Sequence, residues 1–411
     1  MDADVKDVAR SVEAASVMEL LPARPRLLAL GEPTHGEDAL LDLRNDLFRR
    51  LAEREGYRAI AIESDCLAGL VVDDYVTGGT GTLDEVMERG FSHGFGASPA
   101  NRELVRWMRA HNDFGHAAER LRVAGFDGPL EFGGAASPRL ALTSLHAYLA
   151  ARIDAGLLTC AEETLDRLLG ADDRWTDPGA MMDPSHSVGG SEEAAQLRLL
   201  ADDLVALLDT QTPYLIATSS REEWERARLY GRTATGLLLY HSWMADASPG
   251  RMTRLIGLRD SMMAANLLAL AERGPALVHA HNRHLQRERS TMRLGALHLE
   301  WWSAGALVSA RLGEEYAFLA TALGTIRHRG VGTPPPDTVE GLLYGLPGER
   351  SLVGARDLLS ALGDTRPLPR VSPYYGYFPL DPAHLAESDG VVFVRDLRPA
   401  ATTSSSASDT P

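Results

Sequence analysis

Acidic and imidazole side chains follow several short apolar runs of the sequence, each at the point where the run ends. They are Glu32 and His35 after the first run, Glu63 and Asp65 after the second, Asp127 after the third, and His281 and His284 after a later one. Carboxylates beside imidazoles are the groups that general acid–base catalysis uses near neutral pH. One histidine after a strand is more often structural than catalytic, but a pattern shared by four strand ends favours an active site.

His35 is the residue for which a chemical role can be derived most directly, because it lies just before a helical segment. The positive end of a helix dipole disfavours an imidazolium, so we expect a neutral ring that accepts a proton from water. Glu32 or Glu63 would hold its tautomer and stabilise the cation that forms. His281 and His284 would donate to a developing oxyanion or protonate a leaving alkoxide.

Two arginines occupy apolar helix faces, where a charged group needs an explanation. Arg44 shares a face with Leu40 and Leu47, and Arg259 lies among residues such as Leu255 and Met262. A guanidinium does not lose its proton, so a buried one needs an anionic partner. The alternatives are a side chain that reaches water and, for Arg259, an ion pair that ties helix to sheet. We favour arginines directed at the strand-end carboxylates.

The elements that must position these groups alternate between strand-length apolar runs and longer segments of helical period. The apolar runs are 27–30, 57–62, 121–126, 275–278, 316–323 and 390–394. This alternation predicts an α/β fold with a mostly parallel sheet flanked by helices. The carboxyl ends of neighbouring parallel strands share one rim, where open α/β sheets bind their ligands.

The chain divides by pattern into two core parts and a helical region between them. Segments 1–140 and 271–397 carry the strand runs, whereas nearly everything in 141–270 has helical period and predicts a helical insertion or cap. Residues 172–190 are the exception and predict a long exposed loop, whose Met181–Met182 pair suits an apolar lid. The Ser-, Thr- and Ala-rich segment 398–411 predicts a disordered tail.

Composition excludes several classes of function. A net charge of −16 and a pI near 5.3 argue against nucleic-acid binding. Lys6 is the only lysine, which excludes a Schiff-base or P-loop lysine in the core, and two cysteines exclude a disulfide framework. No signal-peptide pattern or bilayer-length apolar run is present, so we expect a cytoplasmic protein with a small-molecule substrate and no membrane partner.

Six features taken together resemble the erythromycin esterase family. They are, in order, GEPTHG, the following helix with Arg44, AIAIES, LRVAGFD, RDSMMAANL and HAHNRH. The resemblance implies an α/β hydrolase with helical additions that opens an ester, a macrolide-like lactone above all, without a metal or other cofactor.

The resemblance also implies roles for individual residues. The histidine matching His35 is the general base for water, and the residues that line the site with it are Glu32, Arg44, Glu63, His281 and His284. Arg259 lies in a shared motif with a less certain role. Independently of the resemblance, Arg259, Asp65, Phe95 and Asp127 are candidates for substrate binding. One departure is His279, which stands where an apolar or aromatic residue is frequent in the family.

The same residues allow other interpretations. Residues 90–94 fit the G-x-S-x-G pattern of a nucleophile elbow around Ser92, but a helix-like rather than a strand-like segment precedes them. Cys66 is expected to be a buried, inert thiol. A metal-dependent hydrolase, a non-catalytic polyketide-binding protein and a biosynthetic enzyme that cyclises or dehydrates a natural product are the remaining alternatives. The sequence specifies neither the substrate nor the oligomeric state.

Overall fold

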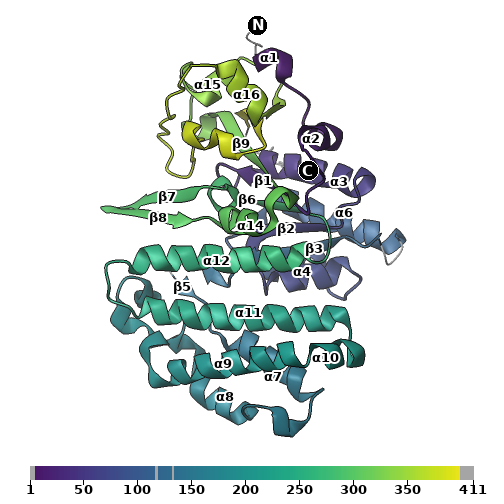
Figure 1. The fold of residues 1–411 in the computed structure, drawn as a ribbon, viewed down its shortest axis with the longest axis vertical. Coiled ribbons are helices and arrows are strands. Elements are labelled where there is room, and N and C mark those ends of the chain that lie inside the picture. Colours follow the sequence, from purple (N-terminus) through teal and green to yellow (C-terminus); the bar gives the residue numbers. More distant parts are fainter. Residues whose placement is uncertain (1–4, 116–118, 132–133, 399–411) are drawn as a thin grey trace, which may run out of the picture.

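A seven-stranded sheet lies at the centre of the computed structural model, which describes residues 5–115, 119–131 and 134–398 (Figure 1). Its strand order is β10-β11-β9-β1-β6-β2-β3, and all neighbours are parallel except β10 and β11. The strands are β1 Leu27–Glu32, β2 Ala59–Asp65, β3 Arg122–Asp127, β6 Ala276–His281, β9 Tyr316–Ile326, β10 Arg350–Gly354 and β11 Gly390–Leu397. The predicted mostly parallel α/β fold is confirmed. Apart from Arg398, the predicted tail lies outside the described residues.

The position of β6 decides which parts of the sequence meet. This late strand is inserted between β1 and β2, and every one of its residues is buried. Leu30 and Ile62 flank His279 on either side in the strand register. The ends of β1, β6 and β2 therefore become neighbours at one rim, although β6 comes long after the other two in the chain.

Side chains of successive strand residues alternate between the two faces of the sheet, and each face is covered by its own helices. Leu28, Leu30, Ile60 and Ile62 share a core with the helices on one face, whereas Ala29, Ala61 and Val278 share a core with the helices on the other. On the first face lie α2 Ala14–Leu20, α3 Asp38–Arg54, α4 Gly69–Val76, α5 Leu83–Arg89 and α6 Pro99–Phe114. On the second face lie α12 Arg251–Ala271 and α14 Ala304–Leu312.

The helical region between the two core parts forms successive rows beside the sheet. In Figure 1, α12 lies next to the sheet, α11 lies against α12, and α9 and α7 lie beyond α11. The helices of this region, besides α12, are α7 Arg139–Ala150, α8 Glu162–Leu169, α9 Glu192–Thr210, α10 Thr212–Thr218 and α11 Arg221–Met244. Because α12 contributes directly to the sheet core, it belongs to the layer that supports the site. The division into core parts and cap stays a prediction.

The segment 172–190 differs in part from the exposed loop that was predicted. It consists of short 3-10 turns: Asp172–Arg174, Pro178–Met181, Pro184–His186 and Val188–Gly190. The ring of Trp175 is buried in the core of the helical region, and its Nε1 donates to the carbonyl of Leu169. Met182, by contrast, is 86% exposed. Apolar burial of one tryptophan therefore anchors a segment whose composition is typical of loops.

Several smaller elements complete the fold. The hairpin β7 Arg289–Leu294 and β8 Leu297–Trp302 extends away from the body in Figure 1. The remaining helices are α1 Val5–Val8, α13 Asn282–Leu285, α15 Val339–Tyr344 and α16 Ala355–Leu362, and a short strand pair joins β4 Leu130–Glu131 to β5 Gly134–Ala135. Among the described helices, none has the length and apolar character needed to cross a membrane.

Candidate active site

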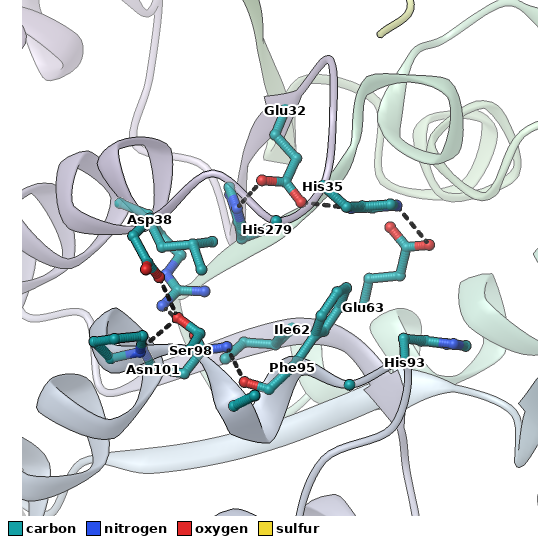
Figure 2. A pocket seen from close by; sticks show the side chains of 16 residues that line it. Glu32, His35, Asp38, Ile62, Glu63, His93, Phe95, Ser98, Asn101 and His279 are labelled. Atoms are coloured by element: carbon teal, nitrogen blue, oxygen red, sulfur yellow. Dashed lines mark hydrogen bonds and ion pairs between the residues drawn. The ribbon is translucent and has the colours of Figure 1, made fainter. Parts of the chain in front are cut away.

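A cavity of about 350 Å³ lies at the carboxyl ends of β1 and β2 (Figure 2). The predicted site residues that line it are Glu32, His35, Arg44, Glu63 and Phe95. Its other polar residues include Asp38, His93, Ser98, Asn101 and His279. The strand-end rim therefore brings together carboxylates and imidazoles from distant parts of the sequence, whereas the predicted residues His281, His284 and Arg259 do not line the cavity.

His35 lies between two carboxylates that belong to different strands. Its Nδ1 is 2.6 Å from Oε1 of Glu32, and its Nε2 is 3.9 Å from Oε1 of Glu63. Glu32 continues the alternation of Leu28 and Leu30 onto the α3 face, whereas Glu63 continues that of Ala61 onto the α12 face. The imidazole thus bridges carboxylates from opposite faces of the sheet, and its side chain is still 40% exposed.

The predicted neutral state of His35 is wrong. Burial by itself would lower the pKa of His35, but the charges of Glu63 and Glu32 and the hydrogen bond to Glu32 outweigh it and raise the pKa to about 9. Two carboxylates close to the ring act more strongly than the dipole of α3, which begins only at Asp38. Near neutral pH the ring is therefore an imidazolium, which must release a proton before it acts as a base.

Glu63 is the anionic centre of the other side of the rim. Its Oε1 lies 3.3 Å from Nη2 of Arg259 and 3.4 Å from Nε2 of His284, and its Oε2 accepts the backbone N–H of His281 at 2.8 Å. Burial would raise the pKa of Glu63, but His284, His35 and Arg259 outweigh it and lower the pKa to about 2. The group is a carboxylate at any pH at which the protein would work.

His281 and His284 are close in sequence but differ in charge. Nδ1 of His281 accepts the backbone N–H of Arg283 at 3.2 Å, so a neutral ring carries its hydrogen on Nε2. That Nε2 is buried without a hydrogen-bond partner among the described residues, and burial lowers the pKa of His281 to about 3. Burial would also lower the pKa of His284, but Asp260, 2.6 Å from its Nδ1, and Glu63 raise it. His281 is therefore a neutral donor and His284 a charged one.

Arg259 has the carboxylate partners that the sequence predicts. Its Nε and Nη2 lie 3.0 Å and 2.6 Å from Oδ2 of Asp127, and Nη2 also contacts Glu63. His93 contacts Asp127 through Nε2 at 3.2 Å and Glu131 through Nδ1 at 2.9 Å, with an unusual left-handed φ of 56°. Asp127, a predicted substrate-binding residue, is fully buried among these groups and does not line the cavity. Its contacts support Arg259 rather than a ligand.

Arg44 is buried as predicted, but its hydrogen-bond partners are not carboxylates. Nη2 donates to the amide oxygens of Asn45 and Asn101 at 2.8 Å and 2.7 Å, and Nε donates to Asn45 at 3.1 Å. Within the described part of the chain, Nη1 is buried with no partner. Burial lowers the pKa of Arg44 to about 10, because neutral amides compensate its charge less than a carboxylate would.

Asp65 was predicted to bind substrate, and the structure directs it elsewhere. A register irregularity in β2 between Ile62 and Asp65 turns its side chain toward the following helix. There its Oδ1 accepts the backbone N–H groups of Leu67 and Ala68 at 2.7 Å and 3.2 Å, close to the start of α4. Asp65 does not line the cavity.

Comparison with known proteins places the chain in a family. Residues 52–397 match the model of the family described as erythromycin esterase. The chain belongs to the erythromycin esterase family. The matched range begins inside α3 and so does not include Glu32, His35 or Arg44, whose roles rest on the geometry above. No curated protein matches this family member by sequence.

Three solved structures share the fold of this erythromycin esterase family member. A Bacillus cereus protein has 17% identity and a TM-score of 0.72, with 96% of this chain and 97% of that chain covered. A succinoglycan biosynthesis protein has 14% identity and a TM-score of 0.69, with 96% and 95% covered. A variant of the erythromycin esterase EreC in its open conformation has 17% identity and a TM-score of 0.64, with 92% of each chain covered.

Two further candidates from the sequence are not nucleophiles in the structure of this family member. Ser92 follows helix α5 rather than a strand, and its Oγ accepts the backbone N–H of Asp65 at 2.8 Å, so no nucleophile elbow forms. Cys66 is buried beside Thr233, and burial raises the pKa of its thiol to about 12. In the described ranges, no group of three or more His, Cys, Asp or Glu side chains could hold a metal ion.

Asp260 and Asn282 are structural supports of the site that the sequence analysis missed. Asp260 is fully buried and accepts from Nε1 of Trp301 at 2.8 Å as well as contacting His284. Asn282 bonds both backbone groups of Thr321 across the end of β1, where a Cβ on Gly31 would lie 2.0 Å from its Oδ1. An acid next to an arginine on an apolar helix face, and a glycine ending a strand, were the available signals.

Proposed function

We propose that this protein hydrolyses a carboxylic ester, specifically the lactone of a macrolide-like natural product, with a water molecule activated by His35. The observation that supports the proposal is the setting of His35. Glu32 holds Nδ1 at 2.6 Å, which leaves Nε2 as the atom that exchanges a proton, on a ring that is 40% exposed at the cavity. A carboxylate that hydrogen-bonds one imidazole nitrogen and leaves the other without a hydrogen bond is the arrangement that a general base needs.

The proposed reaction consumes one water and forms one acid and one alcohol. Nε2 of deprotonated His35 takes a proton from water while the water oxygen bonds to the ester carbonyl carbon. Glu32 stabilises the imidazolium, and the Nε2–H of His281 donates to the new oxyanion. The carbon–oxygen bond of the ester then breaks, and the leaving alkoxide takes the proton from His35. In a lactone both products stay in one molecule.

The cavity walls support a substrate with a carbon skeleton rather than a small ionic ester. Leu41, Ile62 and Phe95 line it together with the polar groups. The ring of Phe95 lies 5.5 Å from that of His35, next to the reacting centre. A volume of about 350 Å³ holds part of a large ligand. The name of the fold neighbour EreC, an erythromycin esterase, favours a macrolide among such ligands.

Mass spectrometry of a panel of macrolides, smaller lactones and aryl esters tests this function. Wild-type protein is expected to add the mass of one water to at least one substrate. His35→Ala is expected to lose that activity, whereas His186→Ala, a change at an exposed histidine in the helical region, is expected to keep it. Hydrolysis that persists in His35→Ala, or no hydrolysis of any panel member by folded wild type, would contradict the proposal.

The imidazolium form of His35 favours one second candidate, a biosynthetic condensation or dehydration on the same scaffold. A pKa of about 9 makes His35 a proton donor at neutral pH, which suits protonation of a leaving hydroxyl group. The fold neighbour named for succinoglycan biosynthesis points the same way. The same mass measurement separates the candidates, because such a reaction releases one water and simple binding leaves the ligand mass unchanged.

Three narrower predictions belong to the same proposal. Activity is expected to survive exhaustive chelation, because the proposed steps use only side chains of this chain. The partner is a small-molecule ester rather than a nucleic acid or a membrane. The protein is expected to act in the cytoplasm.

A further inference from the structure

His279 lies directly behind Glu32, on the same face of the sheet. It belongs to β6, where it is flanked by Leu30 of β1 and Ile62 of β2, and it is 3% exposed. Figure 2 shows Glu32 between the rings of His279 and His35. The carboxylate that holds His35 therefore has a second imidazole on its other oxygen.

The hydrogen-bonding possibilities of His279 fix where its protons lie. Nδ1 is 3.0 Å from the carbonyl oxygen of Leu30, which only accepts, so Nδ1 carries a hydrogen. Nε2 is 3.3 Å from Oε2 of Glu32, in charge contact but without the alignment of a good hydrogen bond. Nε2 of His279 and Oε2 of Glu32 are both buried, and neither has a hydrogen-bond partner among the described residues.

A neutral His279 would be unfavourable in this arrangement. With its single hydrogen on Nδ1, the lone pair of Nε2 would face the carboxylate oxygen of Glu32 inside the protein, where an unpaired polar contact is costly. A proton between Nε2 and Oε2 removes that repulsion. Burial would raise the pKa of the Glu32 carboxyl, but His279 and His35 outweigh it and hold that pKa well below its usual range, so Glu32 is a carboxylate that can accept from both rings.

A charged His279 changes what Glu32 does for His35. The carboxylate of Glu32 then faces two imidazoles. A charged His279 partly compensates the negative charge of Glu32, so Glu32 attracts the proton of His35 less strongly. The other charged or titratable groups near His35 are Glu63 from β2, His281 from β6 and Arg259 from α12, and Arg44 from α3 faces Glu32. Without the charge behind Glu32, His35 would hold its proton more tightly, so less of the ring would be in the neutral form that accepts a proton from water near neutral pH.

We propose that His279 is a positioning residue, which keeps a proton between its Nε2 and Oε2 of Glu32 so that Oε1 orients His35 and His35 can release its own proton. This inference deepens the proposed function and, for its effect on rate, rests on it. It names a residue at the position where the sequence departs from the apolar or aromatic residue frequent in the family.

The test measures the titration of His35 in the full chain without needing a substrate. Protein labelled with ¹³C in the histidine rings is titrated by NMR, and the His35 signal is identified by its loss in His35→Ala. His279→Gln keeps an N–H donor without a charge, and His279→Phe keeps ring size with neither. Both are expected to raise the titration midpoint of His35 by about 1 pH unit, a tenfold change in proton affinity. His146→Gln, a change at a buried histidine whose Nε2 is hydrogen-bonded to the carbonyl of Cys160, serves as control.

Each outcome decides for or against the proton on His279. The proposal would be overturned if the titration midpoint of His35 in folded His279→Gln equalled that in the wild type, since an amide cannot carry the charge. An unchanged His35 midpoint in folded His279→Phe as well would confirm that result. If His279→Phe does not fold, His279→Gln alone decides. Where an ester is hydrolysed, both variants are expected to lose about tenfold in kcat/KM near pH 7 and to regain it at higher pH. Absence of hydrolysis would contradict the proposed function, but the titration of His35 would still test the proton on His279.

Discussion

Three histidines at the rim, His35, His281 and His284, lie in three different electrostatic environments. His35 contacts two carboxylates, and His284 lies between Asp260 and Glu63. Nδ1 of His281 instead accepts a backbone N–H, and within the described ranges no acidic side chain pairs with its ring. The pKa is raised to about 9 for His35 and lowered to about 3 for His281. Environments that push the pKa values of titratable groups apart separate their roles. Here His281 is a fixed donor, and His35 is the group that exchanges a proton.

The pH dependence of the rate follows from the charge of His35. If the neutral ring is the base, kcat/KM rises with pH and levels off above about 9, because only then is most of His35 deprotonated. The measurement is kcat/KM for a hydrolysed ester from about pH 6 to about pH 10, with the uncatalysed rate subtracted. Glu32→Gln is expected to move the rise to lower pH and to reduce the plateau, because the ring loses its anionic neighbour.

A rate that instead falls as the pH approaches 9 would show that the imidazolium is the active form. That result would contradict the general base and favour the proton-donor chemistry of the second candidate. A profile in Glu32→Gln with an unchanged midpoint would show that Glu32 does not set the proton affinity of His35.

At the level of elements, the strands that the sequence predicts are those whose burial makes them continuously apolar. β6 and β9 are buried along their whole length and stand out as apolar runs. β10 was missed because Arg350–Gly354 is a short edge strand, paired antiparallel on one side only. The hairpin β7–β8 was missed because its strands alternate buried and exposed residues and carry several charges.

The location of the site could be predicted from the sequence better than the hydrogen-bond and ion-pair partners of its residues. Polar residues after strand runs indicated the rim, because parallel strands end on one side of a sheet. The amide partners of Arg44 were not predictable, since Asn101 reaches it only through the contact of α6 with α3. The turning of Asp65 depends on an irregularity in β2 that no periodic pattern contains. The charge of His35 depends on how closely Glu32 and Glu63 approach it, which is a property of the folded rim.

The buried carboxylate of Asp260 is one of the groups that attach helix α12 to the site region, and its contacts give a prediction at the scale of elements. Asp260 accepts from His284, from Nε1 of Trp301 and from the backbone N–H of Ala304 at 3.1 Å. Asp260→Asn keeps the size but turns an N–H₂ group toward a donor. We expect the free energy of unfolding to fall by about 1–3 kcal/mol, the range for hydrogen bonds to charged groups and for a buried unsatisfied group.

Urea unfolding followed by circular dichroism measures this change. The matched control is Glu272→Gln, directly after the same helix, where an exposed carboxylate contacts Arg228 and the expected change is within about 0.5 kcal/mol. Equal midpoints for Asp260→Asn and wild type would show that the three contacts of Asp260 contribute no net stability.

At the scale of the whole molecule, the site exists only when the chain is folded. β1, β2 and β6 meet because a strand from the second core part is inserted between two from the first. In the unfolded chain, Glu63 lies far from both His284 and Arg259 along the sequence, and their pKa values return to ordinary ones. Every pKa shift at the rim is therefore also a dependence of folding stability on pH.

The signs of these shifts predict a stability maximum near pH 6.5. The pKa of His35 is raised, so its contribution is complete below about 6.5 and is lost as pH rises through about 9. The pKa of His281 is lowered, so its contribution is complete above about 6.5 and is lost as pH falls toward about 3. Because the pKa of Glu63 is also lowered, its contribution to stability is lost as pH falls from about 4.5 to about 2.

Thermal unfolding at a series of pH values tests this expectation, with Tm greatest near 6.5 and lower on both sides. His281→Gln is expected to make the acid side less steep, because the variant side chain takes up no proton on unfolding. Glu300→Gln, at a partly exposed carboxylate on the hairpin, is expected to leave the shape of the curve unchanged. A Tm that keeps rising from about pH 6.5 to about pH 9 would mean that His35 is not charged in the folded protein. The first histidine would then be the neutral base that its place before α3 suggests, and the carboxylates around it would act on the ring less strongly than their distances imply.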